Sequence, residues 1–112
     1  MSLPLLKIGE NNLHTFTFFQ ADGTTPRPLR ELLECTAQLL NAGRVVAEYT
    51  IGTDDFKGSI DGNTAQLHIS ESVSQHLQRG ELVVDLFTAV ADADFPSGVK
   101  RSKNRYAIFQ VI

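Results

Sequence analysis

Residues 13–29 have the sequence LHTFTFFQADGTTPRPL, and this stretch decides the fold. Phe16 and Phe18 alternate with threonines, which is the period-two pattern of a strand with one buried face. Asp22-Gly23 predicts a tight turn, because glycine adopts positive φ at no steric cost and aspartate hydrogen-bonds its own backbone. Two prolines then fix φ and remove donors, so this exit is neither a helix interior nor a central strand. The rest of the chain must pack on the aromatic face of this strand.

The length and composition fit one globular domain. The chain has 112 residues, of which 42% are hydrophobic and 21% charged, enough for a single core. A formal net charge of -3 argues against nucleic acid as the main partner. No apolar run approaches the length of a membrane span, and the N-terminal residues lack the features of a signal peptide. The one cysteine, Cys35, excludes an intramolecular disulfide, and its apolar surroundings predict a buried, unreactive thiol.

The segment Arg30 to Leu40, RELLECTAQLL, has helical propensity but alternates strictly with period two. We therefore predict a strand, joined by the hairpin turn Asn41-Ala42-Gly43 to another strand over residues 44–51. Further strands are predicted at residues 64–69, 81–90 and 105–112. A short helix is predicted over residues 70–79, capped by Ser70 or Ser72 and stopped by Gly80. Residues 91–104 are expected to form a long polar connection.

Several short strands separated by turn signals, with one short helix, predict an all-β fold. The expected architecture is an antiparallel immunoglobulin-like β-sandwich, formed by residues 1–112 as one domain, with residues 1–12 as an arm or edge strand. Ile108 and Phe109 are neighbours on one strand, so at least one of them should be exposed or cover an edge. The predicted core consists of Phe16, Phe18, Ala37, Leu39, Tyr49, Leu67, Ile69, Val84, Leu86, Ile108 and Phe109.

Residue types that carry chemistry are scattered. The three histidines, His14, His68 and His76, lack the spacing of a metal motif, and His14 and His68 are expected to face outward. Asp54-Asp55 and Asp61 lack most of the ligands of a calcium loop. The acids Asp85, Asp92 and Asp94 give a weak indication of an acidic rim that could hold a cation.

No catalytic motif is present in the sequence. There is no G-x-S-x-G elbow, no phosphate-cradling glycine loop and no dinucleotide fingerprint. We therefore predict a protein that is not an enzyme, with no catalytic, cofactor-binding or metal-binding residues.

The strongest local charge is the cluster Lys100, Arg101, Lys103 and Arg105, which runs from the predicted connection to the first residue of the predicted last strand. One interpretation is a solvated segment that keeps neighbouring strands from pairing with other chains. The other is an electrostatic contact with an acidic partner, which includes another copy of this acidic protein.

Three stretches together resemble the small β-sandwich domains of phage and prophage virions, including the N-terminal domain of baseplate upper proteins. They are TFTFFQADGTTPRPL, GSIDGNTAQLHISESVSQHL and RGELVVDLFTA. The chain departs from that pattern at Leu82 and Val84, where aromatic residues are common, and in its basic residues 91–104. The resemblance implies a non-enzymatic building block of tail, baseplate or head decoration. Such a block contacts other virion proteins and resides in the virion after assembly in the host cytoplasm.

The alternative function is an immunoglobulin-like adhesion or carbohydrate-binding module, which needs a surface platform of aromatic side chains. A small hydrolase ranks third. For assembly, the apolar terminal segments Leu3 to Ile8 and Phe109 to Ile112 carry little charge to block strand pairing. We predict self-association or docking to a virion partner through a terminal strand, oriented by the basic cluster.

Overall fold

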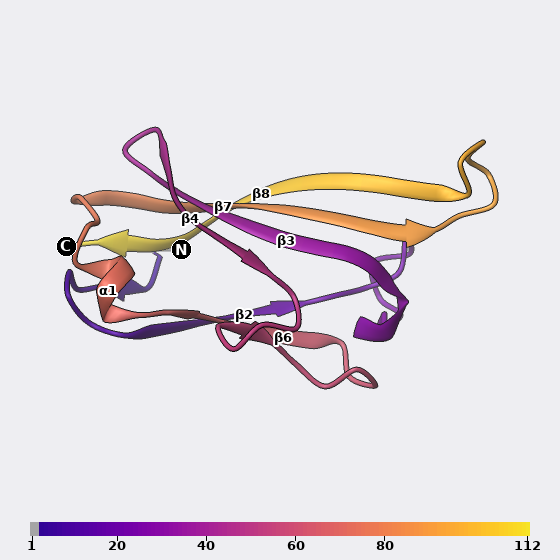
Figure 1. The fold of residues 1–112 in the computed structure, drawn as a ribbon, viewed down its shortest axis with the longest axis horizontal. Coiled ribbons are helices and arrows are strands. Elements are labelled where there is room, and N and C mark those ends of the chain that lie inside the picture. Colours follow the sequence, from indigo (N-terminus) through magenta and orange to yellow (C-terminus); the bar gives the residue numbers. More distant parts are fainter. Residues whose placement is uncertain (1–2) are drawn as a thin grey trace.

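The computed structural model describes residues 3–112; Met1 and Ser2, which begin the predicted arm, lie outside the described residues. Strands dominate the fold, with one 3-10 turn and one short helix (Figure 1). The elements in chain order are β1 (Leu5–Leu6), β2 (Asn12–Thr17), η1 (Leu29–Glu31), β3 (Leu32–Asn41), β4 (Arg44–Thr50), β5 (Phe56–Lys57), β6 (Thr64–Ile69), α1 (Glu71–Ser74), β7 (Gly80–Ala91) and β8 (Val99–Val111).

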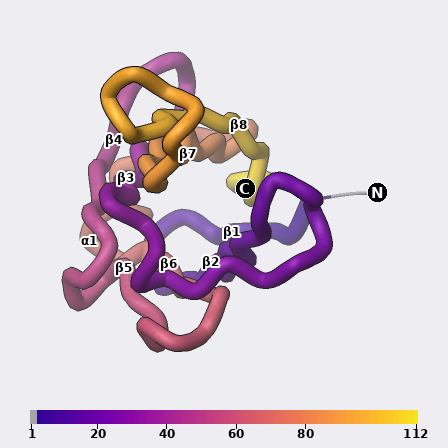
Figure 2. Tube along the Cα trace, turned by 90° about the vertical axis from the view of Figure 1, so that its right-hand side faces the viewer, coloured from indigo at the N-terminus to yellow at the C-terminus, as the bar shows by residue number. Residues whose placement is uncertain are grey.

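The strands form two sheets that face each other across the core (Figures 1 and 2). The larger sheet has the order β1-β8-β7-β3-β4, and the smaller has the order β2-β6-β5. Neighbours run antiparallel except β1 and β8, which are parallel. The all-β prediction is therefore confirmed, and β2, the strand that contains Phe16, lies at an edge of the smaller sheet.

The strand prediction over residues 30–40 is confirmed by β3, although its first residues form η1. The predicted hairpin turn follows, with Ala42 at φ 53° and Gly43 at φ 77°. Two successive positive φ values give a turn whose twist matches that of the flanking strands. β6 has the predicted bounds.

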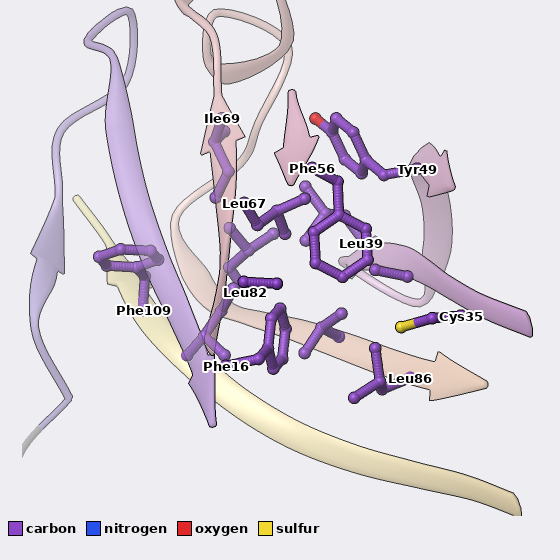
Figure 3. Packing of buried hydrophobic residues seen from close by; sticks show 14 of the residues in the cluster. Phe16, Cys35, Leu39, Tyr49, Phe56, Leu67, Ile69, Leu82, Leu86 and Phe109 are labelled. Atoms are coloured by element: carbon purple, nitrogen blue, oxygen red, sulfur yellow. The ribbon is translucent and has the colours of Figure 1, made fainter. Parts of the chain in front are cut away.

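The core contains all of the predicted residues, and Figure 3 shows Phe16, Leu39 and Phe56 converging between the sheets. Phe56, which is not among the predicted core residues, is completely buried. Ile108 and Phe109 are both buried, so only the second expected outcome, that one of them covers an edge, is compatible with the structure. The pairing of β7 with β8 shifts register at this point, so the bulge turns two consecutive side chains into the core.

The predicted connection over residues 91–104 was wrong. β8 begins at Val99, and it pairs with β7 in a long hairpin that extends from the pair Ala91–Val99 to the pair Gly80–Val111. The loop of residues 92–98 is closed by a 2.9 Å hydrogen bond from the Asp92 amide to the Gly98 carbonyl. Charged side chains are common on sheet edges, where they deter pairing with other chains, so a polar composition does not exclude a strand.

The helix is shorter than predicted. The Ser70 hydroxyl accepts from the Val73 amide as expected, but α1 ends at Ser74, and Gly80 begins β7. The Ser74 hydroxyl accepts a 2.9 Å hydrogen bond from the Gly9 amide, which ties α1 to the N-terminal segment. Leu77 is buried just beyond the helix.

The two terminal segments pair with each other. The amide of Gln110 donates to the Pro4 carbonyl at 2.8 Å, and the Ile112 amide donates to the Leu6 carbonyl at 3.0 Å. Leu6 is fully buried by this contact. The expectation of an open terminal edge is therefore wrong for residues 110–112, and the unpaired edge lies earlier along β8.

Candidate functional site

A groove separates β2 from the β7–β8 hairpin, on the side where the two sheets part. It has a volume of about 610 Å³ and is open to solvent. Phe16 of β2 and Phe18, just after the end of β2, line it on one side, while Leu86 and Ile108 line it from β7 and β8. These four side chains are also part of the buried core, so the floor of the groove is apolar.

Two sheet edges border this groove. In the described structure β2 pairs only with β6, which leaves its other edge without a strand partner. β8 pairs with β7 on one side, while β1 covers the other side only at Gln110 and Val111. Within residues 3–112, the stretch 99–109 of β8 therefore has a free edge. No pattern in the sequence indicated this groove.

The rim of the groove is polar and aromatic. Lys100, Ser102, Asn104 and Tyr106 line it from alternate positions of β8, as the pleat of a strand requires. Tyr106 is 44% exposed, and Phe19, on the β2 side, is 45% exposed.

His14 also lines the groove, and the prediction that it faces outward was wrong. It lies two residues from Phe16, so the two side chains share one face of β2. The His14 ring is edge-on to the Phe16 ring at 4.7 Å between centroids and lies 6.1 Å from that of Phe109. Burial lowers the pKa of His14, because the protonated ring loses hydration there.

The four residues of the predicted basic contact lie on β8 and not in a loop, and the strand divides them between two faces. Lys100 lines the groove, whereas Arg101, Lys103 and Arg105 occupy the outer face of the larger sheet. Because side chains alternate along β8, Lys100 lies on the opposite face of the sheet from the other three cations.

The three outer cations contact carboxylates on β7, the neighbouring strand, and on β3, the strand beyond it. Arg105 makes a bidentate pair with Asp85, with nitrogen–oxygen distances of 2.7 and 2.9 Å. The ammonium of Lys103 lies 3.7 Å from Asp85 Oδ2 and 5.6 Å from the centroid of the Phe87 ring. Arg101 pairs with Glu34 on β3.

Asp85 is nearly buried beneath these cations, although it lies on the outer face. The hydrogen bonds from Arg105 lower the pKa of Asp85, assisted by the positive charges of Arg105 and Lys103 and opposed by burial. Its carboxylate is therefore held in the ionised form by its cation partners.

The remaining titratable residues do not converge. His68 faces outward as predicted, with Nδ1 2.9 Å from Asp55 Oδ1, and His76 is exposed beyond α1. Asp92 accepts from the amide of Asp94, whereas Asp85 is engaged by Arg105 in the middle of β7, so the acidic rim is not formed. Across residues 3–112, no three His, Cys, Asp or Glu side chains are grouped to hold a metal ion.

Cys35 is buried in the core, as predicted. Burial raises the pKa of its thiol to about 12, because the thiolate is poorly solvated there. The thiol is therefore a core side chain with no nucleophilic character at neutral pH.

Comparison of the chain with protein-family models, with curated proteins and with solved structures finds no match. The described part of the chain contains no helix with the length and apolar character needed to cross a membrane.

Proposed function

We propose that the chain is a structural and interaction module of a phage or prophage particle, built as an immunoglobulin-like sandwich and acting through contacts with other virion proteins. The observation that carries this proposal is the free edge of β8 beside an apolar groove. Unpaired backbone groups at a sheet edge are a template for another polypeptide, and an adjacent groove accepts its side chains.

The strand order supports the immunoglobulin-like assignment. Naming β2 to β8 in chain order B, C, C′, D, E, F and G places B, E and D together in one sheet and G, F, C and C′ in the other. This is the division of strands found in immunoglobulin-type sandwiches. β1 then lies beside G as a short additional strand.

The three stretches that resemble virion domains fall on strands of both sheets. The first covers part of β2 and the turn after it, the second covers β6 and α1, and the third covers most of β7. They contribute strands to both sheets, so the resemblance extends across the core and is not confined to one hairpin.

The proposal is tested in particles produced by the strain that carries the gene. Purified particles are separated on a density gradient, and the chain is quantified by mass spectrometry in each fraction. We expect the chain to sediment with the particles and its gene to lie among head or tail genes. A chain found only among free proteins, encoded away from such genes, would contradict the proposal.

The adhesion or carbohydrate-binding alternative is favoured by one observation. Phe19 and Tyr106 are half-exposed aromatic side chains on the same groove, beside the amide of Asn104. Aromatic faces and polar side chains are suited to the apolar and hydroxyl surfaces of sugars. Saturable binding on a glycan array, abolished by Tyr106→Ala and Phe19→Ala, would favour this function over assembly.

A further inference from the structure

The free edge of β8 and the groove beside it point to one kind of occupant. We propose that an extended segment of a partner protein adds to this edge as a strand, and that its side chains alternate between acidic and apolar. This inference rests on the proposed interaction function and specifies the chemistry of the partner.

The chain already uses strand addition at one end of the same edge. β1 lies beside β8 at Gln110 and Val111, held by backbone hydrogen bonds such as that from Gln110 to Pro4. The edge continues without a described partner over residues 99–109 (Figures 1 and 2). A guest strand would therefore extend a row of hydrogen bonds that the chain has begun.

The pleat of β8 determines what this guest strand must present on each face. Along β8, Ser102, Asn104 and Tyr106 face the groove, and Arg101, Lys103 and Arg105 face outward. Side chains of an added strand would alternate between the same two faces. Its inward side chains would meet an apolar floor that includes Phe16 and Ile108, so they should be apolar.

The outward side chains of the guest would lie beside a row of cations. Arg101, Lys103 and Arg105 share two carboxylates, Glu34 and Asp85, so one positive charge is in excess. Both carboxylates come from β3 and β7, on the side of β8 away from the free edge. The cation side chains remain 67%, 54% and 60% exposed, respectively. Acidic side chains on the guest would be favourable cross-strand neighbours.

The same row of cations disfavours a second copy of β8 as the occupant. Antiparallel pairing of two β8 edges would bring Arg101, Lys103 and Arg105 of one copy close to those of the other. Like charges on neighbouring strands are destabilising. The charge pattern therefore selects an acidic segment from another protein over self-pairing.

The test uses fluorescent peptides and the full chain. One peptide alternates valine and glutamate, a second alternates valine and lysine, and a third contains the valines and glutamates of the first in two blocks. Binding is measured by fluorescence anisotropy, and the site is located by amide chemical shifts in NMR spectra. We expect the alternating glutamate peptide to bind most tightly and to shift amides of residues 99–107.

Charge reversal provides the decisive variant. Arg101→Glu with Lys103→Glu should weaken binding of the glutamate peptide by about tenfold and shift the preference to the lysine peptide. Arg44→Glu with Lys57→Glu is the matched control, because it changes net charge equally at exposed residues of β4 and β5. Circular dichroism checks that both variants remain folded, and the switch in preference is a gain that unfolding cannot produce.

Three results would overturn the inference: no binding of the glutamate peptide, equal binding of the block peptide, or amide shifts confined to other edges. These outcomes are separable from failure of the proposed function. If the chain sediments with particles but does not bind the peptides, the proposed function stands and the proposed partner chemistry is wrong. If the chain binds the glutamate peptide but is absent from particles, the partner chemistry stands and the proposed virion function is wrong.

Discussion

Among the glycines, Gly58 has the least space for a side chain. A Cβ at this position would overlap the carbonyl oxygen of Thr64 and lie 2.9 Å from Leu29 Cδ1. Gly58→Ala should therefore lower the free energy of unfolding by about 1–3 kcal/mol, since a backbone oxygen cannot move aside. Urea denaturation measures the change. Gly62→Ala is the control, because its Cβ would have its nearest neighbours at 3.6 Å, and equal stability of the two variants would contradict the crowding.

His14 links stability to pH. Burial lowers its pKa below the ordinary value of 6.5, so the unfolded chain binds a proton that the folded chain resists. Its contribution to stability is therefore complete above about pH 6.5 and decreases as the pH falls toward its pKa in the folded state.

The corresponding variant is His14→Gln, followed by thermal unfolding between pH 7.5 and 5. We expect a smaller loss of melting temperature on acidification than in the parent chain. His76→Gln, at an exposed position, should retain the parent's pH dependence. An unchanged pH profile for His14→Gln would show that this histidine is not the group responsible.

At the scale of elements, the Asp85–Arg105 pair joins β7 to β8 on the outer face. Arg105→Met should lower the melting temperature, because it leaves a nearly buried carboxylate without its bidentate partner. The double variant Asp85→Leu with Arg105→Met should recover most of the loss, since an apolar pair needs no charge compensation. A double variant less stable than Arg105→Met alone would show that Asp85 has another stabilising role.

Strands with regular alternation could be predicted from the sequence, and irregular ones could not. β3 was correctly predicted because Cys35, Ala37 and Leu39 alternate strictly, despite helical propensity. The start of β8 was missed because its outward positions are cationic and its groove-facing positions polar, which resembles a loop. The bulge near Ile108 depends on the register with β7, and no pattern within β8 alone reveals it.

For the whole molecule, the core between the two sheets provides the stability. Phe56 is fully buried and packs edge-on to Phe16 at 5.8 Å between ring centroids, so Phe56→Ala should cost about 3–5 kcal/mol.

Phe18→Ala should fall toward the lower end of that range, because Phe18 borders the open groove. Phe19→Ala, at a 45% exposed position, should change the free energy of unfolding by no more than about 0.5 kcal/mol. Equal effects of Phe18→Ala and Phe19→Ala on the free energy of unfolding would contradict the burial of Phe18 and the exposure of Phe19.

The candidate site is a property of the whole molecule, which explains why the sequence did not reveal it. Its walls come from β2 and from the β7–β8 hairpin, which are remote in the chain and belong to different sheets. The sequence did identify Lys100, Arg101, Lys103 and Arg105 as a charged group. It could not reveal that alternate residues of the same strand face a groove beside β2.

The pairing of β1 with the end of β8 has a consequence for biosynthesis. Leu5 and Leu6 leave the ribosome more than a hundred residues before their partners Gln110 and Val111. Non-local pairs of this kind form slowly, because a long loop must close first. In a nascent chain that ends before β8, Leu6 therefore lacks the contact that buries it, and one edge of β7 has no strand partner. Synthesis of β8 supplies the partner for both β1 and β7, so docking of the N-terminal segment should be a late event in folding.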